Sequence, residues 1–459
     1  MALSRRHFLL GSSSALVLSA CSSPLLTVDN APGYDYVLTA QPHPIELIPG
    51  TTTPAWCFNQ AYPMEPLRAK QGQPVRILFR NRLAEPTTIH WHGLRIPIQM
   101  DGVPFLSQPP VAPGSDFLYE FTPPDAGTFW FHPHVNSLQQ LGRGLVGALI
   151  VEEAEAVAFD QDITLLLKNW HLEEDGEFAP FTSPRNAARM GTPGNWETVN
   201  GAVKPTIEVP CGARVRLRFL NVDNTVMYTL AAAGVNATVI AIDGNPVAKP
   251  FLLEPHKMGP GMRLDVAINT PNEAGKTVKI RNGKGKLFFD LVSFVTVGQP
   301  NPNPTLTIPT LPLNPIKEVN LSQAEELNFV FEWEGAITPA AKNGKTQHQF
   351  WTINRRAWQG MSAQSIPEPV ANLKLGGHYV FNLRNVTPHA HPIHLHGYTW
   401  KVLESNKREI TPYHTDTVLL EKNERVKVAF VADNPGRWMY HCHVIEHMKT
   451  GLMGYIKVA

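Results

Sequence analysis

The chain has 459 residues, of which 43% are hydrophobic and 17% are charged, and its formal net charge is +1 at pH 7. This balance excludes an intrinsically disordered chain, and the even spread of Lys and Arg excludes a basic nucleic-acid-binding surface. The 41 prolines and 33 glycines, set among short apolar runs, favour strands and turns over long helices.

Residues 1–30 are predicted to be an export signal and tether. Arg5-Arg6 and the residues around them resemble a twin-arginine signal, and the apolar stretch that follows is too short to span a bilayer. Residues 18–21 resemble a bacterial lipoprotein cleavage site, so we expect a lipid on Cys21 that tethers the protein to a membrane. Ordinary cleavage after Ala20 is the alternative. Either outcome places the protein in the periplasm or cell envelope.

Export also permits a disulfide between Cys57 and Cys211. The sequence does not show whether the two residues approach closely enough, so a disulfide and two buried free thiols both remain open.

Short alternating strands repeat along the chain, and a turn signal follows each one. Residues 75–80, 214–220 and 380–384 alternate in polarity, and each run is followed by an asparagine. The copies lie about 140 to 165 residues apart, which is the spacing of domains and not of a solenoid. The chain is therefore predicted to be all-β, with three consecutive β-sandwich domains.

We place domain 1 at residues 31–155, domain 2 at residues 156–297 and domain 3 at residues 316–459. The acidic stretch from Glu152 to Glu155 marks the first boundary. Residues 298–315 are rich in Pro and Asn and are predicted to be a linker.

Paired histidines carry the strongest functional signal. Scattering the 18 histidines at random would give about 0.7 His-x-His pairs as a template count. Five occur: His90/His92, His132/His134, His389/His391, His394/His396 and His441/His443. Residues i and i+2 of a strand point to the same face, so each pair is predicted to be a two-pronged metal clamp. One such pair could arise by chance, but five together indicate metal binding.

Cys442 lies between His441 and His443. In an extended segment the two imidazoles face one side and the thiolate faces the other, so one tripeptide addresses two metal sites. His447 can turn back toward the sulfur, and His391 falls on the opposite strand face from the pair that follows it. One thiolate with two imidazoles makes a trigonal site typical of blue copper, whereas zinc does not cycle between redox states.

Four motifs together resemble the copper motifs of the multicopper oxidase family, which includes laccases, bilirubin oxidases and bacterial cuprous oxidases. They are His90-Trp91-His92-Gly93, His132-Pro133-His134, His391-Pro392-Ile393-His394-Leu395-His396-Gly397 and His441-Cys442-His443-Val444-Ile445-Glu446-His447. Their order and spacing match the family over roughly residues 35–459. The resemblance implies three cupredoxin-like Greek-key domains and four copper ions per chain.

The resemblance also implies the ligand of each copper ion, with a trinuclear cluster between domains 1 and 3. The type 1 copper would be held by His391, Cys442 and His447, and the type 2 copper by His90 and His394. The coupled type 3 pair would be held by His92, His132, His134, His396, His441 and His443. Electrons would pass singly from the type 1 site through the cysteine to the cluster, where O2 is reduced.

Other positions follow from the same resemblance. The axial position on the type 1 copper falls on Leu452, which has no donor atom, although a local shift could bring the sulfur of Met453 there. Asp101 matches a carboxylate beside the trinuclear cluster and is expected to relay protons, with turn capping as the alternative. Asp416 matches a position near the type 1 histidine and is expected to orient His391 or receive substrate, with an exposed strand-end Asp as the alternative.

A second proton-relay acid is not evident. The position that some relatives use is Met448 here, and Glu446 is nearby in the sequence. His389 lies outside the family motif and is expected to neighbour the copper without binding it.

The sequence therefore predicts a monomeric oxidase that takes O2 and a small reducing substrate. A laccase-like enzyme with phenolic or aromatic amine donors is the leading hypothesis. A periplasmic cuprous oxidase is the alternative, although such relatives carry a methionine-rich insertion in domain 3, and the 11 methionines here form no cluster between Gly298 and His391. A third hypothesis is a non-enzymatic copper-binding protein of the cell envelope.

Overall fold

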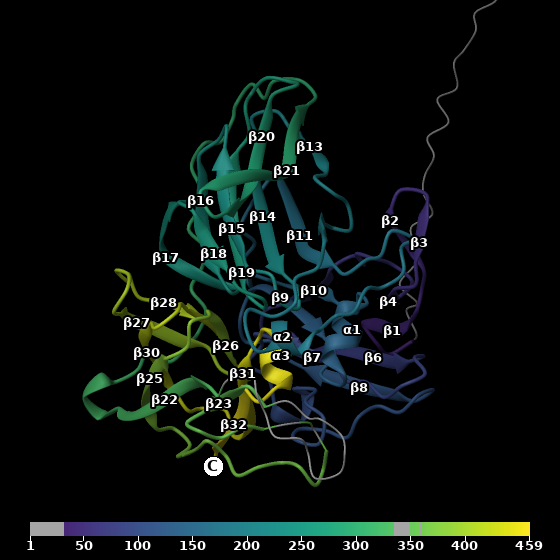
Figure 1. Cartoon of the computed structure of the whole chain (residues 1–459). Helices are drawn as coiled ribbons and strands as arrows, with labels where there is room; N and C mark the ends of the chain where they lie inside the picture. Colours follow the sequence, from purple (N-terminus) through teal and green to yellow (C-terminus); the bar gives the residue numbers. More distant parts are fainter. Residues whose placement is uncertain (1–31, 335–348, 359, 361) are drawn as a thin grey trace, which may run out of the picture.

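The computed structural model describes residues 32–334, 349–358, 360 and 362–459. The predicted export signal and Cys21 lie outside these residues. The strands form three pairs of packed sheets that follow one another along the chain, which confirms the predicted all-β class (Figure 1). Among the described residues, no helix has the length and apolar character needed to cross a membrane.

Domain 1 consists of two four-stranded sheets. Their orders are β4-β1-β6-β8 (Trp56–Phe58, Tyr36–Pro42, Val75–Asn81, Asp116–Phe121) and β5-β10-β9-β7 (Leu67–Lys70, Gly147–Glu152, Gly127–His132, His90–His92). The domain also contains the hairpin β2-β3 (Ile45–Ile48, Thr51–Thr53), the 3-10 turn η1 (Ile98–Met100) and helix α1 (Ser137–Gly142). In β6, Ile77 and Phe79 pack in the core while Arg76 faces solvent, as its alternation predicts.

Domain 2 repeats this plan with larger sheets. Their orders are β12-β11-β14-β19-β16-β17 (Trp196–Val199, Gln161–Trp170, Arg214–Asn221, Arg263–Asn269, Ala237–Ile242, Asn245–Leu252) and β13-β21-β20-β15-β18 (Thr206–Pro210, Leu287–Val297, Thr277–Lys284, Tyr228–Ala233, His256–Met258). Helix α2 (Pro184–Ala187) lies in the loop between β11 and β12. β14 is parallel to β11 and antiparallel to β19, just as β6 is parallel to β1 and antiparallel to β8.

Domain 3 is the third copy. Its sheets have the orders β23-β22-β25-β30-β27-β28 (Trp351–Ile353, Glu325–Trp333, His378–Asn385, Arg425–Val431, Trp400–Ser405, Tyr413–Thr415) and β24-β32-β31-β26-β29 (Ala371–Leu373, Met453–Val458, Gly436–Cys442, His391–Leu395, Thr417–Leu420). The 3-10 turn η2 (Leu321–Gln323) precedes the first sheet, and helix α3 (Ile445–Lys449) lies between β31 and β32. β25 pairs with β22 and β30 as β14 pairs with β11 and β19, so the three repeats seen in the sequence occupy equivalent strands.

Domains 1 and 2 meet through charged side chains. Arg216 and Arg218 are buried and reach Asp265 Oδ2 at 2.7 and 3.2 Å. Asp265 Oδ1 accepts a hydrogen bond from Thr128 of domain 1 at 2.7 Å, and Arg216 also pairs with Glu153 at 2.8 Å. Burial of these charges is tolerated because each one is paired and hydrogen-bonded.

The segment between domains 2 and 3 is held against both earlier domains. Residues 298–320 contain no strand. Leu311 is buried against Ile240 of domain 2. The side-chain amide of Asn314 both accepts from the backbone N–H of Ala126 at 2.9 Å and donates to its carbonyl at 3.0 Å.

Cys57 and Cys211 are both buried free thiols. Burial raises the pKa of Cys57 to about 12, so this thiol stays protonated at neutral pH. Of the two alternatives that the sequence left open, the structure therefore contains the free thiols.

Replacement of Gly127 by Ala should disrupt the close contact between domain 1 and domain 2. Gly127 begins β9 with φ +142°, and an added Cβ would lie 2.0 Å from the carbonyl oxygen of Gly244. We expect Gly127→Ala to lower the free energy of unfolding by about 3 kcal/mol. Gly114→Ala is the control, because Gly114 also has a positive φ but nothing within 4 Å, and it should cost only about 1 kcal/mol. Equal losses in denaturant titrations would contradict the close contact.

Candidate metal centre

Most predicted ligands of the histidine cluster come from strands at the border between domains 1 and 3, or from the residues just after them. β7 pairs antiparallel with β9, which places His90 directly opposite His132. β26 pairs in the same way with β31, which places His394 opposite His441. Trp91, between the two histidines of β7, packs in the core of domain 1, so strand alternation turns both flanking imidazoles toward domain 3.

Eight imidazoles gather in one buried cluster: His90, His92, His132, His134, His394, His396, His441 and His443. Rings from the two domains stack, with centroids 3.7 Å apart for His90–His396 and 3.8 Å apart for His92–His394. Every one of these residues is at most 3% exposed. The structure thus brings together all the residues predicted as type 2 and type 3 ligands.

The nitrogens of this cluster fit a group of metal ions. Several are buried without a hydrogen-bond partner among the described residues: Nε2 of His90, His132 and His394, and both ring nitrogens of His134 and His443. The Nε2 atoms of His396 and His441 lie 3.1 Å apart. Buried polar atoms rarely lack partners, and converging lone pairs are stabilised by cations. Burial and the neighbouring histidines lower the pKa of four of these rings, so they are neutral and able to bind metal at pH 7: His132, His134, His441 and His443.

His92 presents a different nitrogen from its neighbours. In His90, Nδ1 donates to the carbonyl of Asp101 at 2.8 Å and Nε2 is free. In His92, Nε2 donates to Asp416 Oδ1 at 3.0 Å, and Nδ1 is the buried nitrogen without a partner. The carboxylate therefore selects the ring nitrogen that His92 offers to a metal.

A second donor set has the trigonal form predicted for blue copper. The Nδ1 atoms of His391 and His447 lie 3.1 Å apart, and Cys442 Sγ lies 3.6 Å from each. All three side chains are fully buried. The outer Nε2 atoms are hydrogen-bonded, in His391 to the Thr387 hydroxyl and in His447 to the carbonyl of Arg189, at 2.8 Å in both cases. Burial raises the pKa of the Cys442 thiol, so metal binding would displace its proton.

Leu452 borders this trigonal set. Its carbonyl accepts from the N–H of Cys442 at 3.0 Å, and its own N–H donates to the carbonyl of His447 at 2.9 Å. The Leu452 side chain lies in the same apolar cluster as Cys442, whereas Met453 packs in a different cluster. The side chain of Leu452, and not that of Met453, therefore packs in the apolar cluster that contains Cys442, and the axial position stays a prediction.

Asp101 lies at the edge of the histidine cluster. Both carboxylate oxygens are 3.1 Å from His396 Nδ1, and Oδ1 is 3.2 Å from His90 Nδ1. Asp101 therefore contacts one predicted type 2 ligand and one predicted type 3 ligand, and its side chain is buried. Asp101 also precedes Gly102, which has a positive φ, so the residue lies in a turn as the turn-capping alternative expected, and it contacts the cluster as well.

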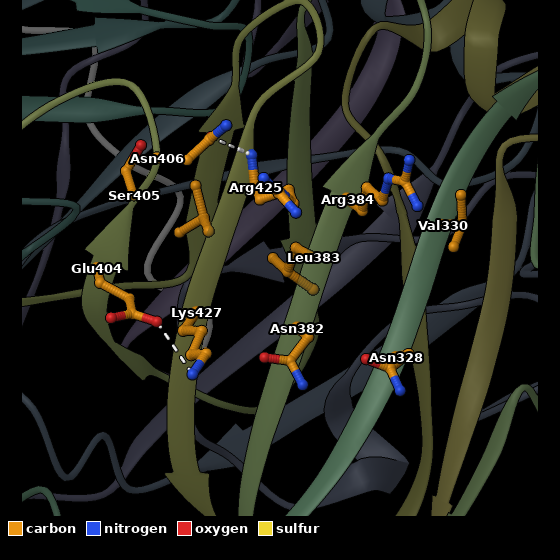
Figure 2. Close-up of a pocket in the computed structure, with 11 residues that line it drawn as sticks. Asn328, Val330, Asn382, Leu383, Arg384, Glu404, Ser405, Asn406, Arg425 and Lys427 are labelled. Carbon is orange, nitrogen blue, oxygen red and sulfur yellow. Dashed lines mark hydrogen bonds and ion pairs between the residues drawn. The ribbon is translucent and has the colours of Figure 1, made fainter.

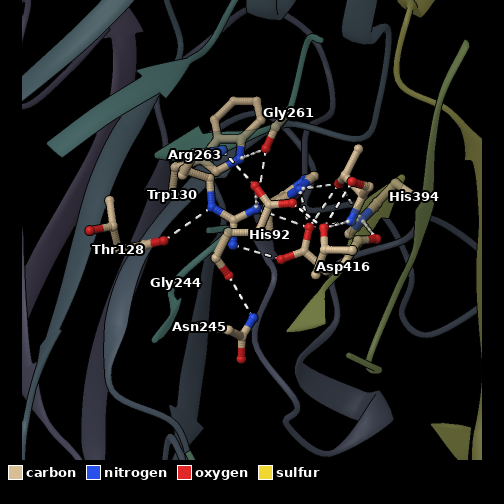
Figure 3. Close-up of polar contacts among 12 residues, drawn as sticks. His92, Thr128, Trp130, Gly244, Asn245, Gly261, Arg263, His394 and Asp416 are labelled. Carbon is tan, nitrogen blue, oxygen red and sulfur yellow. Dashed lines mark hydrogen bonds and ion pairs between the residues drawn. The ribbon is translucent and has the colours of Figure 1, made fainter. Parts of the chain in front are cut away.

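The predicted location of Asp416 beside His391 is wrong. Asp416 is fully buried next to the histidine cluster, because it lies opposite Leu395 at the far end of β26 from His391. Arg263 of domain 2 holds both of its oxygens, at 2.9 and 2.6 Å, and also donates to the carbonyl of Thr128 at 3.0 Å (Figure 3). Burial alone would raise the pKa of Asp416, but the Arg263 guanidinium holds this pKa well below its usual range.

Arg263 was not identified from the sequence. It begins β19, in which Leu264, Val266 and Ile268 are apolar, and an arginine beside such buried positions is the signal that could have found it. His389 was predicted to neighbour the copper. The centroid of its ring lies 5.9 Å from that of Trp351, and Trp351 in turn contacts both imidazoles of the trigonal set.

An open groove of about 600 Å³ is separate from the metal centre. It lies on the outer face of the six-stranded sheet of domain 3 and is lined by polar residues that include Arg384, Arg425 and Lys427 (Figure 2). None of the predicted ligands lines this groove.

Comparison with known proteins agrees with this geometry. Three family models described as multicopper oxidase match residues 39–156, 161–287 and 331–459. The crystal structure of a multicopper oxidase from Pseudomonas thermotolerans is 49% identical, with a TM-score of 0.83, and the match covers 92% of this chain and 98% of that chain.

Two curated proteins are more distant relatives. Multicopper oxidase MmcO of Mycobacterium tuberculosis is 28% identical over 98% of this chain and 95% of its own length. Laccase-2 of Botryotinia fuckeliana is 27% identical over 88% of this chain and 78% of its own length.

Removal of Arg263 should destabilise the protein and reduce metal binding. Arg263→Met leaves the Asp416 carboxylate buried without its partner, so we expect a loss of about 3–5 kcal/mol in the free energy of unfolding. Arg76→Met removes an exposed pair with Glu120, whose side chains are 44% and 52% exposed, and should cost less than about 1 kcal/mol. Denaturant titration and metal analysis of both variants, with Arg263→Lys as an intermediate, test this expectation. Equal stability of the two Met variants would contradict it.

Proposed function

The chain belongs to the multicopper oxidase family, and on that premise we propose that it couples four one-electron oxidations of a small donor to the reduction of O2 to water, with one type 1, one type 2 and two type 3 copper ions per chain. Members of this family are oxidoreductases that use O2. Bound copper supplies reversible one-electron chemistry at the trigonal set and a site for O2 reduction at the histidine cluster.

One observation carries this proposal: a single tripeptide joins the two donor sets. Cys442 Sγ faces His391 and His447, whereas the flanking His441 and His443 belong to the cluster. The path between the sets is therefore covalent and short. A copper carrier would need no such connection.

Two buried carboxylates have separate roles in the proposal. Asp101 contacts His90 and His396 through its carboxylate and can pass protons toward the cluster. Asp416 acts as a positioning residue, because it accepts from His92 and is itself held by Arg263.

We propose phenols or aromatic amines as donors. The similarity to a fungal laccase supports this class. A cuprous oxidase is the second candidate, and thioethers would be needed to bind Cu(I). Among the described residues Met190 is the one exposed methionine, with an exposed fraction of 72%. A single exposed thioether is few for a Cu(I)-binding surface.

We also propose that the chain acts in the periplasm or cell envelope. The twin arginine, the short apolar stretch and Cys21 support export with a lipid tether. A monomer is proposed on the length and three-domain plan of the chain.

Replacement of Cys442 by Ser should abolish the type 1 site alone. The variant should lose the absorption near about 600 nm that copper–thiolate charge transfer produces, and about one of four copper ions. Cys211→Ser changes a buried free thiol away from the ligands and should keep both signals. Persistence of the colour in Cys442→Ser would disprove the assignment of the sulfur ligand.

Oxygen uptake with parallel donors tests the enzymatic proposal. Copper-loaded protein is given a phenol, an aromatic amine, Cu(I) or Fe(II) at equal concentrations. We expect the phenol to give at least about ten-fold higher kcat/KM than either metal ion. Higher values with Cu(I) would favour the cuprous oxidase, and no O2 uptake with any donor would end the oxidase proposal.

A further inference from the structure

A segment of domain 2 covers the trigonal donor set of domain 3. We call residues 182–192, which include helix α2, the strap. Both of its ends are tied to Glu446, the residue before His447, because the Thr182 and Thr192 hydroxyls donate to Glu446 Oε1 at 2.6 and 2.8 Å. Helix α2 accordingly lies beside α3 (Figure 1).

The middle of the strap is equally fixed. Trp351 Nε1 donates to the carbonyl of Ala187 at 2.8 Å, and Ala187 and Ala188 are buried in the core of domain 3. The Trp351 ring lies 4.4 Å from the ring of His447 and 5.0 Å from that of His391. A donor molecule therefore meets the strap before it meets either imidazole.

One hydrogen bond connects the trigonal set to the outer surface of the strap. His447 is 0% exposed, and its Nδ1 faces Cys442, so its outward Nε2–H donates to the carbonyl of Arg189 at 2.8 Å. The side chains of Arg189 and Met190 are exposed. The outer nitrogen of the buried His447 is thus hydrogen-bonded to the backbone of a residue whose own side chain is exposed.

The surface around this hydrogen bond is positive. Arg189 and Lys422 are both exposed cations. Both cations act on His389, which touches the edge of Trp351. Glu446 of α3, to which the strap is tied, is buried and accepts hydrogen bonds from Thr182 and Thr192. Such a surface favours an anion and repels a metal cation.

We propose that the strap is the surface at which electrons are received and that Arg189 selects aromatic anions, phenols that carry a carboxylate, as donors. The inference rests on the proposed oxidase function. Each phenol gives one electron through the Arg189 carbonyl and the His447 N–H, releases its phenolic proton to water and leaves as a phenoxyl radical. Four such donors supply the four electrons with which O2 and four protons form two water molecules.

A matched pair of donors tests the role of Arg189. We compare 4-hydroxy-3,5-dimethoxybenzoate with its uncharged methyl ester on the copper-loaded protein. Arg189→Glu should lower kcat/KM for the acid by about ten-fold or more and change that for the ester less than about two-fold. Lys249→Glu makes the same change in charge at an exposed position on β17 and should leave the acid-to-ester ratio unchanged.

Binding without oxidation gives a second readout. Calorimetry should detect binding of the redox-inert 4-methoxybenzoate to the copper-loaded protein. Arg189→Glu should raise the Kd of this ligand by about ten-fold and leave the copper content and the visible absorption unchanged. An acid-to-ester ratio that is equal in Arg189→Glu and the parent overturns the inference while leaving the oxidase intact. A protein that consumes no O2 with either donor overturns the proposed function as well.

Discussion

A fully buried ion pair between Arg263 and Asp416 lies where the three domains meet, and the geometry of the histidine cluster depends on it. Burial of two charges costs free energy that Coulomb attraction alone offsets poorly, so such a pair needs further hydrogen bonds. Those bonds involve all three domains. Arg263 donates to the carbonyls of Thr128 in domain 1 and Gly261 in domain 2, and Asp416 accepts from the ring of His92 in domain 1 and the hydroxyl of Thr417 in domain 3. Domain 2, which supplies none of the predicted ligands, thus controls how the ligands of domains 1 and 3 face one another.

Strand alternation places the two donor sets on opposite sides of one sheet. In β31 the imidazole of His441 faces the neighbouring domain while Cys442 packs with Leu452 inside domain 3. The same alternation in β26 separates His391 from His394. A period of two residues therefore produces both a cluster at a domain border and a trigonal site within a core, connected by a single peptide unit. Neither site requires an irregular backbone at its metal-binding strands.

Much of this arrangement could be predicted from the sequence, because ligand spacing and strand period are local properties. Four of the histidine pairs and Cys442 lie where strand spacing places them, and Asp101 lies beside the cluster as the family resemblance implied. Asp416 was misplaced because a sequence offset from His391 does not reveal which end of a paired strand a residue occupies. Arg263 was missed because its partner lies 153 residues away, and only the packing of three domains brings the two together.

In the strap proposal, the surface that a donor meets and the metal ligands come from different domains. The predicted metal ligands are buried in strands, just after strand ends or in helix α3, whereas the surface that a donor meets belongs to a loop of domain 2. The side chains of Arg189 and Met190 are exposed and do not pack in the core. Their replacement can therefore alter the charge and shape of the strap surface without moving His447. The backbone carbonyl that receives the His447 N–H is independent of the side chain at that position. Donor preference can therefore change on this fold while the route to the sulfur stays the same.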